Sequence, residues 1–145
     1  MHDLKTTDAM ITIRGSQRTG GDNENIEVVT AGSYAIRGGS FFIRYEESEA
    51  TGFAGSRTTL CYDPTRSQVT LIRRGSTTSE LIIEKGRRHQ CTYDTGYGKL
   101  ILGVSGDRVE STLTESGGEM SFSYSLDVNT ALASENSVDI TVALT

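Results

Sequence analysis

The sequence lacks tryptophan, contains a single proline, and has no hydrophobic run approaching the roughly 20 residues that a membrane-spanning helix needs. Its first residues, among them His2, Asp3 and Lys5, do not form a basic segment followed by an apolar stretch, so they do not resemble a secretory signal. We therefore expect a cytoplasmic protein that does not enter a membrane.

Positive charge is not concentrated anywhere along the chain. The 14 Lys and Arg residues are scattered among 19 Asp and Glu residues, and the formal net charge is −5. Binding to a polyanion depends on clustered Lys and Arg side chains that replace its counterions. Nucleic acid and anionic membrane surfaces are therefore not expected as partners.

Cysteine is also scarce. Cys61 and Cys91 could form at most one disulfide, and both lie inside strand-like runs. In a cytoplasmic protein we expect both thiols to be reduced and to pack as small apolar side chains.

Recognisable catalytic and metal-binding motifs are missing. His89 is the one histidine outside the first residues, so a multi-histidine zinc site cannot form, and the sequence contains no Gly-x-Ser-x-Gly motif. Gly96 and Gly98 precede a strand-like run and not a helix, so they lack the helix N-terminus that binds phosphate. We expect no catalytic residue, no metal and no cofactor.

Short strand-type runs separated by turn signals dominate the chain. Residues 120–126 show the clearest alternation of apolar and polar side chains, and Gly38 with Gly39 is typical of a tight hairpin turn. Only residues 129–135 read as helical, and only for one or two turns. The other runs are residues 9–14, 26–30, 34–37, 41–46, 57–62, 69–74, 81–84, 88–93, 99–104, 109–114 and 138–144.

This pattern predicts an all-β fold. Evenly spaced strands favour a sandwich or an up-and-down barrel, and we prefer the barrel because closure removes exposed sheet edges. We expect one antiparallel barrel of about 8 to 10 strands with at most one short helical turn. A chain of 145 residues suits a single domain, residues 1–145, in which residues 1–8 form a flexible N-terminus.

Several segments together resemble the YwiB-like family of small bacterial proteins, a domain of unknown function. They are residues 45–52 (YEESEATG), 71–75 (LIRRG), 93–104 (YDTGYGKLILGV) and 131–136 (ALASEN), and the resemblance extends from about residue 11 to residue 142. The family implies a lipocalin-type, or calycin-like, β-barrel, which agrees with the strand pattern. It implies no catalytic or binding residues.

Candidate site residues follow from the direction of side chains along each strand. Because successive residues face opposite sides of a sheet, Tyr45 and Glu47 share the more apolar face of one strand with Phe41 and Ile43. By the same rule Arg73 shares a face with Val69 and Leu71, and Tyr93 with His89 and Cys91. If these faces line the interior, Glu47 and Arg73 should pair near one mouth of the barrel, with the Tyr93 hydroxyl completing the network. We predict a ligand site at Tyr45, Glu47, Arg73 and Tyr93.

Three roles remain open for this group. It is a structural ion pair that fixes the strand register, an anchor for the polar end of a bound ligand, or an acid/base site at Glu47. The corresponding functions are a carrier or sensor of a small, partly apolar molecule, a protein-interaction module with a filled core, and an enzyme. We prefer the non-enzymatic carrier, with the ligand among Ile43, Tyr45, Leu71, Tyr93 and Phe122.

Overall fold

A computed structural model describes residues 6–49, 53–76, 78–94 and 97–145 of the chain. Within these residues it contains ten antiparallel strands that close into one barrel, in the order β1-β10-β9-β8-β7-β6-β5-β4-β3-β2. The strands are β1 (Thr7–Thr19), β2 (Asp22–Arg37), β3 (Ser40–Glu46), β4 (Ser56–Asp63), β5 (Gln68–Gly75), β6 (Thr78–Glu84), β7 (Arg88–Asp94), β8 (Lys99–Ser111), β9 (Gly117–Val128) and β10 (Ala131–Leu144).

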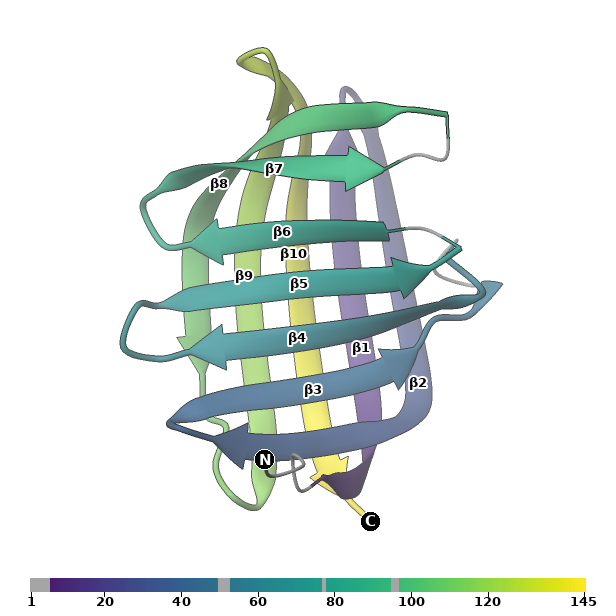
Figure 1. The fold of residues 1–145 in the computed structure, drawn as a ribbon, viewed down its shortest axis with the longest axis vertical. Helices are drawn as coiled ribbons and strands as arrows, with labels where there is room; N and C mark the ends of the chain where they lie inside the picture. Colours follow the sequence, from purple (N-terminus) through teal and green to yellow (C-terminus); the bar gives the residue numbers. More distant parts are fainter. Residues whose placement is uncertain (1–5, 50–52, 77, 95–96) are drawn as a thin grey trace.

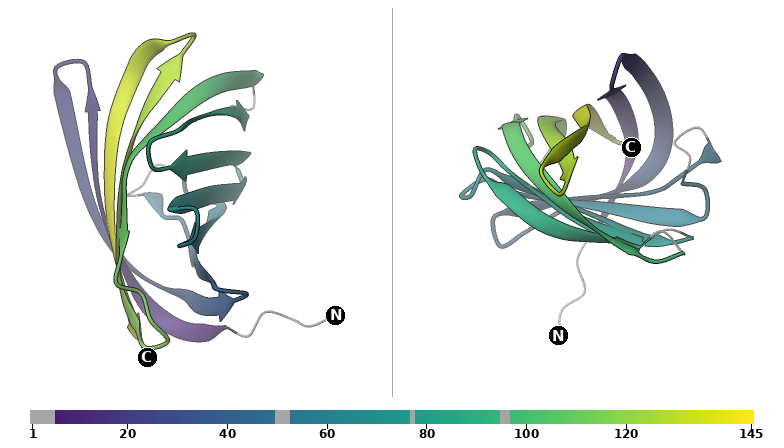
Figure 2. Two further views of the ribbon diagram at one scale, coloured as in Figure 1. Left: turned by 90° about the vertical axis from the view of Figure 1, so that its left-hand side faces the viewer. Right: turned by 90° about the horizontal axis from the view of Figure 1, so that it is seen from above.

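Every strand pairs with the strands that precede and follow it in the chain, and β10 closes the barrel on β1. The expected up-and-down barrel is confirmed. Figure 1 shows that the short strands β3–β7 run across the long strands β8, β9, β10, β1 and β2, so that the barrel is flattened into two crossed layers. The two layers meet where β2 bends into β3 and diverge toward the β1–β2 and β9–β10 turns (Figure 2).

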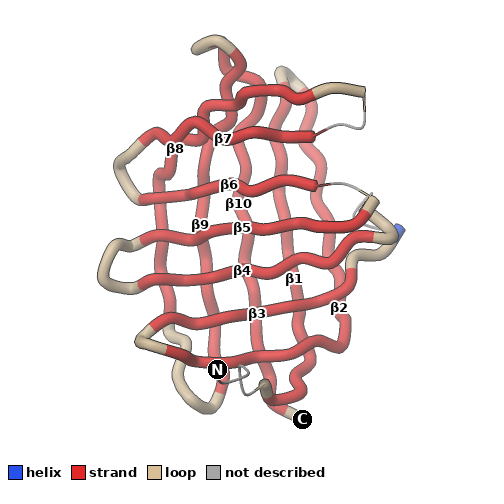
Figure 3. Tube along the Cα trace, viewed as in Figure 1, coloured by secondary structure: helices blue, strands red, loops and turns tan. Residues whose placement is uncertain are grey.

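The expected helical turn over residues 129–135 is wrong. Asn129 and Thr130 form a two-residue turn with φ of 52° and 67°, and β10 begins immediately after it. Two central residues with positive φ are typical of the turns that join twisted antiparallel strands. The described residues form strands and turns almost throughout (Figure 3).

Several strands are also longer than the alternation predicted. β2 and β8 each join two of the expected runs, because the strands continue through Gly32 and Gly106. β1 begins at Thr7, so Thr7 and Asp8 belong to a strand and not to a flexible N-terminus. Residues 1–5 of that predicted segment lie outside the described residues.

Most of the barrel interior is filled with apolar side chains. Alternate residues of each strand point inward and are almost inaccessible to water, as strand geometry requires. Phe122 and Met120 of β9 pack there with aliphatic side chains of the other strands, including Ile11, Ile43, Leu60, Val69, Leu81, Ile83, Val104 and Ile140.

The pairing between β6 and β7 is the weakest in the barrel. The two strands pair only at Thr78 with Asp94 and at Ser79 with Tyr93, and the Ile82 amide donates to the Cys91 sulfur at 3.4 Å. Strand β8 instead reaches the β6–β7 turn directly. Gly86 N–H donates to the Gly106 carbonyl, and Gly106 N–H donates to the Arg87 carbonyl, each at 3.0 Å.

Both cysteines are free thiols, and Cys91 is buried while Cys61 is partly exposed. Burial raises the pKa of both thiols. Among the described residues there is no helix of the length and hydrophobicity needed to span a bilayer.

Candidate functional site

A row of polar side chains crosses the inner face of five neighbouring strands. Tyr45 of β3 lies opposite Thr58 of β4, and Thr58 lies opposite Arg73 of β5. Arg73 lies opposite Ser79 of β6, which in turn lies opposite Tyr93 of β7. Directly opposed residues point to the same side of a sheet. These side chains therefore form one polar layer at one end of the short strands, beside the apolar core.

Glu47, which follows the last residue of β3, completes this layer. Its Oε1 accepts a hydrogen bond from the Thr58 hydroxyl at 2.6 Å and lies 3.6 Å from Nη2 of Arg73. The side chain of Glu47 is only 1% exposed and that of Arg73 only 12%. We refer to Tyr45, Glu47, Thr58, Arg73, Ser79 and Tyr93 as the polar layer.

The polar layer is incompletely satisfied. In the part of the chain that the structure describes, three buried side-chain polar atoms have no hydrogen-bonding partner, and all three belong to it: Glu47 Oε2, Arg73 Nε and Ser79 Oγ. A buried polar atom without a partner costs about 1–3 kcal/mol. The layer therefore offers one acceptor, one donor and one hydroxyl that can act as either.

Two aromatic side chains lie next to Arg73. The ring of Phe53, in the β3–β4 connection, has its centroid 3.7 Å from the guanidinium carbon, a cation–π contact. Burial raises the pKa of Tyr124 on β9, and the nearby positive charge of Arg73 opposes this shift. Arg73 thus lies between the carboxylate of Glu47 and the ring of Phe53.

A cavity of about 400 Å³ opens beside these two aromatic residues. By strand alternation its inward-facing wall residues include Gly15, Ile26 and Val138, and Ile26 remains 38% exposed although it faces inward. The absence of a side chain at Gly15 contributes to the hollow. We call this space the mouth cavity; it is lined by Gly15, Ser16, Gln17, Glu24, Ile26, Glu49, Phe53, Tyr124, Asn136, Ser137 and Val138.

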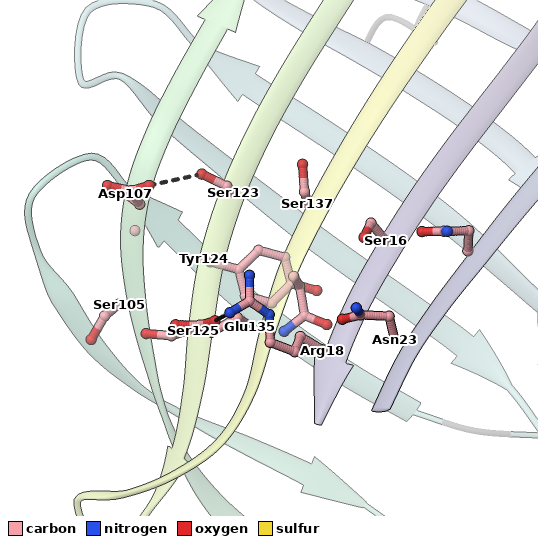
Figure 4. A pocket seen from close by; sticks show the side chains of 13 residues that line it. Ser16, Arg18, Asn23, Ser105, Asp107, Ser123, Tyr124, Ser125, Glu135 and Ser137 are labelled. Atoms are coloured by element: carbon pink, nitrogen blue, oxygen red, sulfur yellow. Dashed lines mark hydrogen bonds and ion pairs between the residues drawn. The ribbon is translucent and has the colours of Figure 1, made fainter. Parts of the chain in front are cut away.

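A larger hollow of about 790 Å³ lies on the outer face of the long strands. Figure 4 shows its polar lining, with the Ser123 hydroxyl donating to Asp107 at 3.2 Å. Arg18 and Glu135 form an exposed ion pair across it at 3.6 Å. This hollow lies outside the barrel, whereas the three unpartnered buried atoms belong to side chains on the inner face of the strands, so we place the candidate site inside the barrel.

The structure brings three of the four predicted site residues together. Tyr45, Glu47 and Arg73 lie on the same inner face, as alternation predicted. Tyr93 faces inward but lies beyond Ser79, and among the described contacts its hydroxyl makes no hydrogen bond with Glu47 or Arg73. The tyrosine that interacts with the charged pair is Tyr45.

Burial raises the pKa of Tyr45 well above its usual range, and the nearby carboxylate of Glu47 adds to this shift. The positive charge of Arg73 and a hydrogen bond with Thr58 oppose it. The neutral phenol is therefore favoured in the folded protein.

This shift predicts a loss of stability in alkali. Because the pKa of Tyr45 is higher in the folded than in the unfolded chain, its contribution is complete below pH of about 10 and falls as the pH rises further. We expect the free energy of unfolding, measured by urea denaturation, to fall less steeply above that pH in Tyr45→Phe. Ile43→Val, on the same face and without a titratable group, should retain the wild-type slope. An unchanged slope in Tyr45→Phe would contradict the assignment.

Sequence reasoning missed Thr58, Ser79, Phe53 and Tyr124. Thr58 and Ser79 carry a detectable signal, since each alternates with an inward-facing apolar residue of its strand, Leu60 and Leu81. Phe53 lies in a connection between strands, where no periodicity predicts its direction. The described residues contain no group of three or more His, Cys, Asp or Glu side chains that could hold a metal ion.

Comparison with known proteins places the chain in a defined family and fold. The family described as Domain of unknown function (DUF1934) matches residues 11–140. No curated protein matches. The crystal structure of the ywiB protein from Bacillus subtilis superposes with a TM-score of 0.85 at 21% sequence identity, over 98% of this chain and 95% of that one. At this identity the likeness concerns the fold.

Proposed function

The chain belongs to the DUF1934 family of domains of unknown function, and we propose that it binds a small, partly apolar molecule. Its barrel has an open mouth cavity and a polar layer in which three buried atoms lack hydrogen-bonding partners. The observation that carries the proposal is the position of the three unpartnered buried atoms in one layer, which the Phe53 ring, lining the mouth cavity and contacting Arg73, separates from that cavity. Tyr45, Glu47, Arg73 and Tyr93 are its proposed binding residues, with Ser79 added from the strand register.

The energy balance favours a ligand that reaches this layer. Moving the Phe53 ring from the Arg73 guanidinium gives up a cation–π contact worth roughly 0.5–2 kcal/mol. A hydrogen bond to a charged group is worth about 1.5–3 kcal/mol, and both Glu47 Oε2 and Arg73 Nε are available for one. Two such bonds outweigh the lost contact.

The mouth cavity accounts for the apolar part of the ligand. Ile26 and Val138 supply aliphatic surface, and Phe53 and Tyr124 supply aromatic surface. A volume of about 400 Å³ lies within the range of small-molecule sites. The interior around Phe122 and Met120 is filled with side chains, so the proposed ligand can occupy only the mouth cavity.

Filling the mouth cavity should abolish binding. We expect the neutral fluorescent probe N-phenyl-1-naphthylamine to bind the wild-type protein saturably, with one molecule per barrel. Gly15→Val should reduce this affinity by about tenfold or more, because the added side chain occupies the cavity. The measurement is a fluorescence titration, with native mass spectrometry of freshly purified protein to detect any molecule already bound.

The matched control is Gly21→Val in the β1–β2 turn, where an added Cβ meets no neighbouring atom. This variant should bind the probe as the wild type does. The proposal is overturned if the wild type shows no saturable binding, or if Gly15→Val remains folded and binds the probe with unchanged affinity.

A further inference from the structure

The three unpartnered atoms also define the chemistry of the ligand. We propose, on the basis of the ligand-binding function above, that the barrel selects a neutral, planar cyclic amide: a ring with an N–H donor beside a carbonyl acceptor. The class includes lactams, cyclic imides and pyrimidine bases. Donor and acceptor availability, charge and ring stacking each support this assignment.

The first argument concerns which atoms are free. Glu47 Oε1 is already engaged by the Thr58 hydroxyl and by Arg73, so Oε2 is the carboxylate oxygen left to accept a hydrogen bond. A carboxylate oxygen requires a donor from the ligand. The ligand must therefore present an N–H or O–H group toward Glu47.

The second argument concerns the acceptor that the ligand must also carry. Arg73 has a free Nε–H, and a guanidinium can only donate. Ser79, directly opposite Arg73 on β6, has a buried hydroxyl that can donate to the same acceptor. Glu47 Oε1 and Arg73 Nη2 lie 3.6 Å apart, so the two side chains that carry the free Oε2 and Nε are neighbours, and one ligand edge with a donor beside an acceptor suits them. An amide edge has this arrangement.

The third argument concerns charge. Glu47 and Arg73 form a buried pair whose charges cancel. A cationic or anionic group placed against them would add a buried charge without a counterion, which is strongly unfavourable. A neutral ligand avoids this cost and still forms charge-assisted hydrogen bonds with both residues.

The fourth argument concerns shape. The centroid of the Phe53 ring lies 3.7 Å from the guanidinium carbon, so the space beside Arg73 already holds a flat ring. Arg guanidinium groups also stack favourably on other planar systems. A ligand that displaces Phe53 can place a flat ring against Arg73, with the polar edge of that ring turned toward Arg73 Nε, Glu47 Oε2 and Ser79 Oγ.

Uracil and 1,3-dimethyluracil together test whether the ligand needs an N–H donor. Both are neutral rings with the same carbonyl groups, but the dimethyl compound has no N–H donor. In isothermal titration calorimetry with the wild-type protein, we expect uracil to bind saturably and 1,3-dimethyluracil to bind about tenfold more weakly or not at all. Benzylammonium and benzoate test the charge requirement and should bind more weakly than uracil.

Two variants test the residues. Ser79→Ala should weaken uracil binding several-fold without lowering the thermal midpoint, because the lost hydroxyl has no partner in the folded protein. Phe53→Ala should strengthen uracil binding by about threefold to thirtyfold, because no ring must leave Arg73.

Equal affinity for the two pyrimidines, no saturable uracil binding, or tighter binding of benzylammonium at the carboxylates of Glu24 and Glu49 would overturn the inference. Saturable binding of N-phenyl-1-naphthylamine that Gly15→Val abolishes would then leave the proposed function standing. If the wild-type protein bound neither uracil nor N-phenyl-1-naphthylamine saturably, the proposed function would be overturned as well.

Discussion

Replacing Glu47 by alanine should destabilise the protein by about 3–5 kcal/mol, because it leaves the Arg73 charge buried without a counterion. The Thr58 hydroxyl would lose its acceptor in the same variant. Domains of this kind have total stabilities of roughly 5–15 kcal/mol, so the expected loss is a large fraction of the whole. Urea denaturation followed by circular dichroism measures it directly.

Glu46, the last residue of β3 and the neighbour of Glu47 in the chain, provides a matched control. Its Oε1 lies 2.7 Å from Nε of Arg57, a shorter distance than in the buried pair, but both side chains are more than half exposed. Exposed ion pairs contribute about 0–1 kcal/mol, and we expect Glu46→Ala to change stability by no more than that. Similar effects of the two substitutions would show that burial does not determine the strength of the Glu47–Arg73 pair.

A double variant separates the cost of an unpaired charge from the value of the pair. Glu47→Leu combined with Arg73→Leu removes both charges and restores apolar volume, so it should be more stable than Glu47→Ala alone. The double variant should also lose binding of N-phenyl-1-naphthylamine or uracil that depends on these groups. The double variant would then regain stability relative to Glu47→Ala without regaining binding.

Replacing Gly106 by alanine should cost about 2–5 kcal/mol, because a Cβ at this position meets the backbone of Glu84. Gly106 forms two backbone hydrogen bonds with the β6–β7 turn, at the place where β6 and β7 pair least. Moving the turn away would break both bonds and open the barrel between these strands. Thermal unfolding and hydrogen exchange of the Gly86 amide would report the change.

Gly103, in the same strand, supplies the comparison. An added Cβ there meets the guanidinium of Arg88 and the carboxylate of Asp127, which pair across it at 2.7 and 2.9 Å. These are the ends of side chains in a partly exposed pair and can move, so Gly103→Ala should cost less than about 1 kcal/mol. If Gly103→Ala is as damaging as Gly106→Ala, backbone contact with Glu84 is not the cause.

Much of the fold could be predicted from local sequence. The alternation in residues 120–126 identified which face of β9 is buried, and Gly38 with Gly39 formed the expected turn with φ of 59° and 82°. The turn at Asn129 and Thr130 was missed, because neither residue carries the glycine signal that usually marks positive φ.

Part of the candidate site could be predicted in the same way. Alternation alone placed Glu47 and Arg73 on inner faces, and the structure pairs them. It could not decide which tyrosine joins them, because Tyr45 and Tyr93 both face inward and differ only in their cross-strand neighbours.

The sequence by itself therefore determined the strands, their buried faces and the residues able to point into a barrel, since these follow from a side-chain period of two within each strand. The tertiary structure decided which of those residues meet. Register between strands placed Ser79 beside Arg73, and the β3–β4 connection brought Phe53 over the guanidinium. Such neighbours depend on hydrogen bonds between distant segments, and no local pattern encodes them.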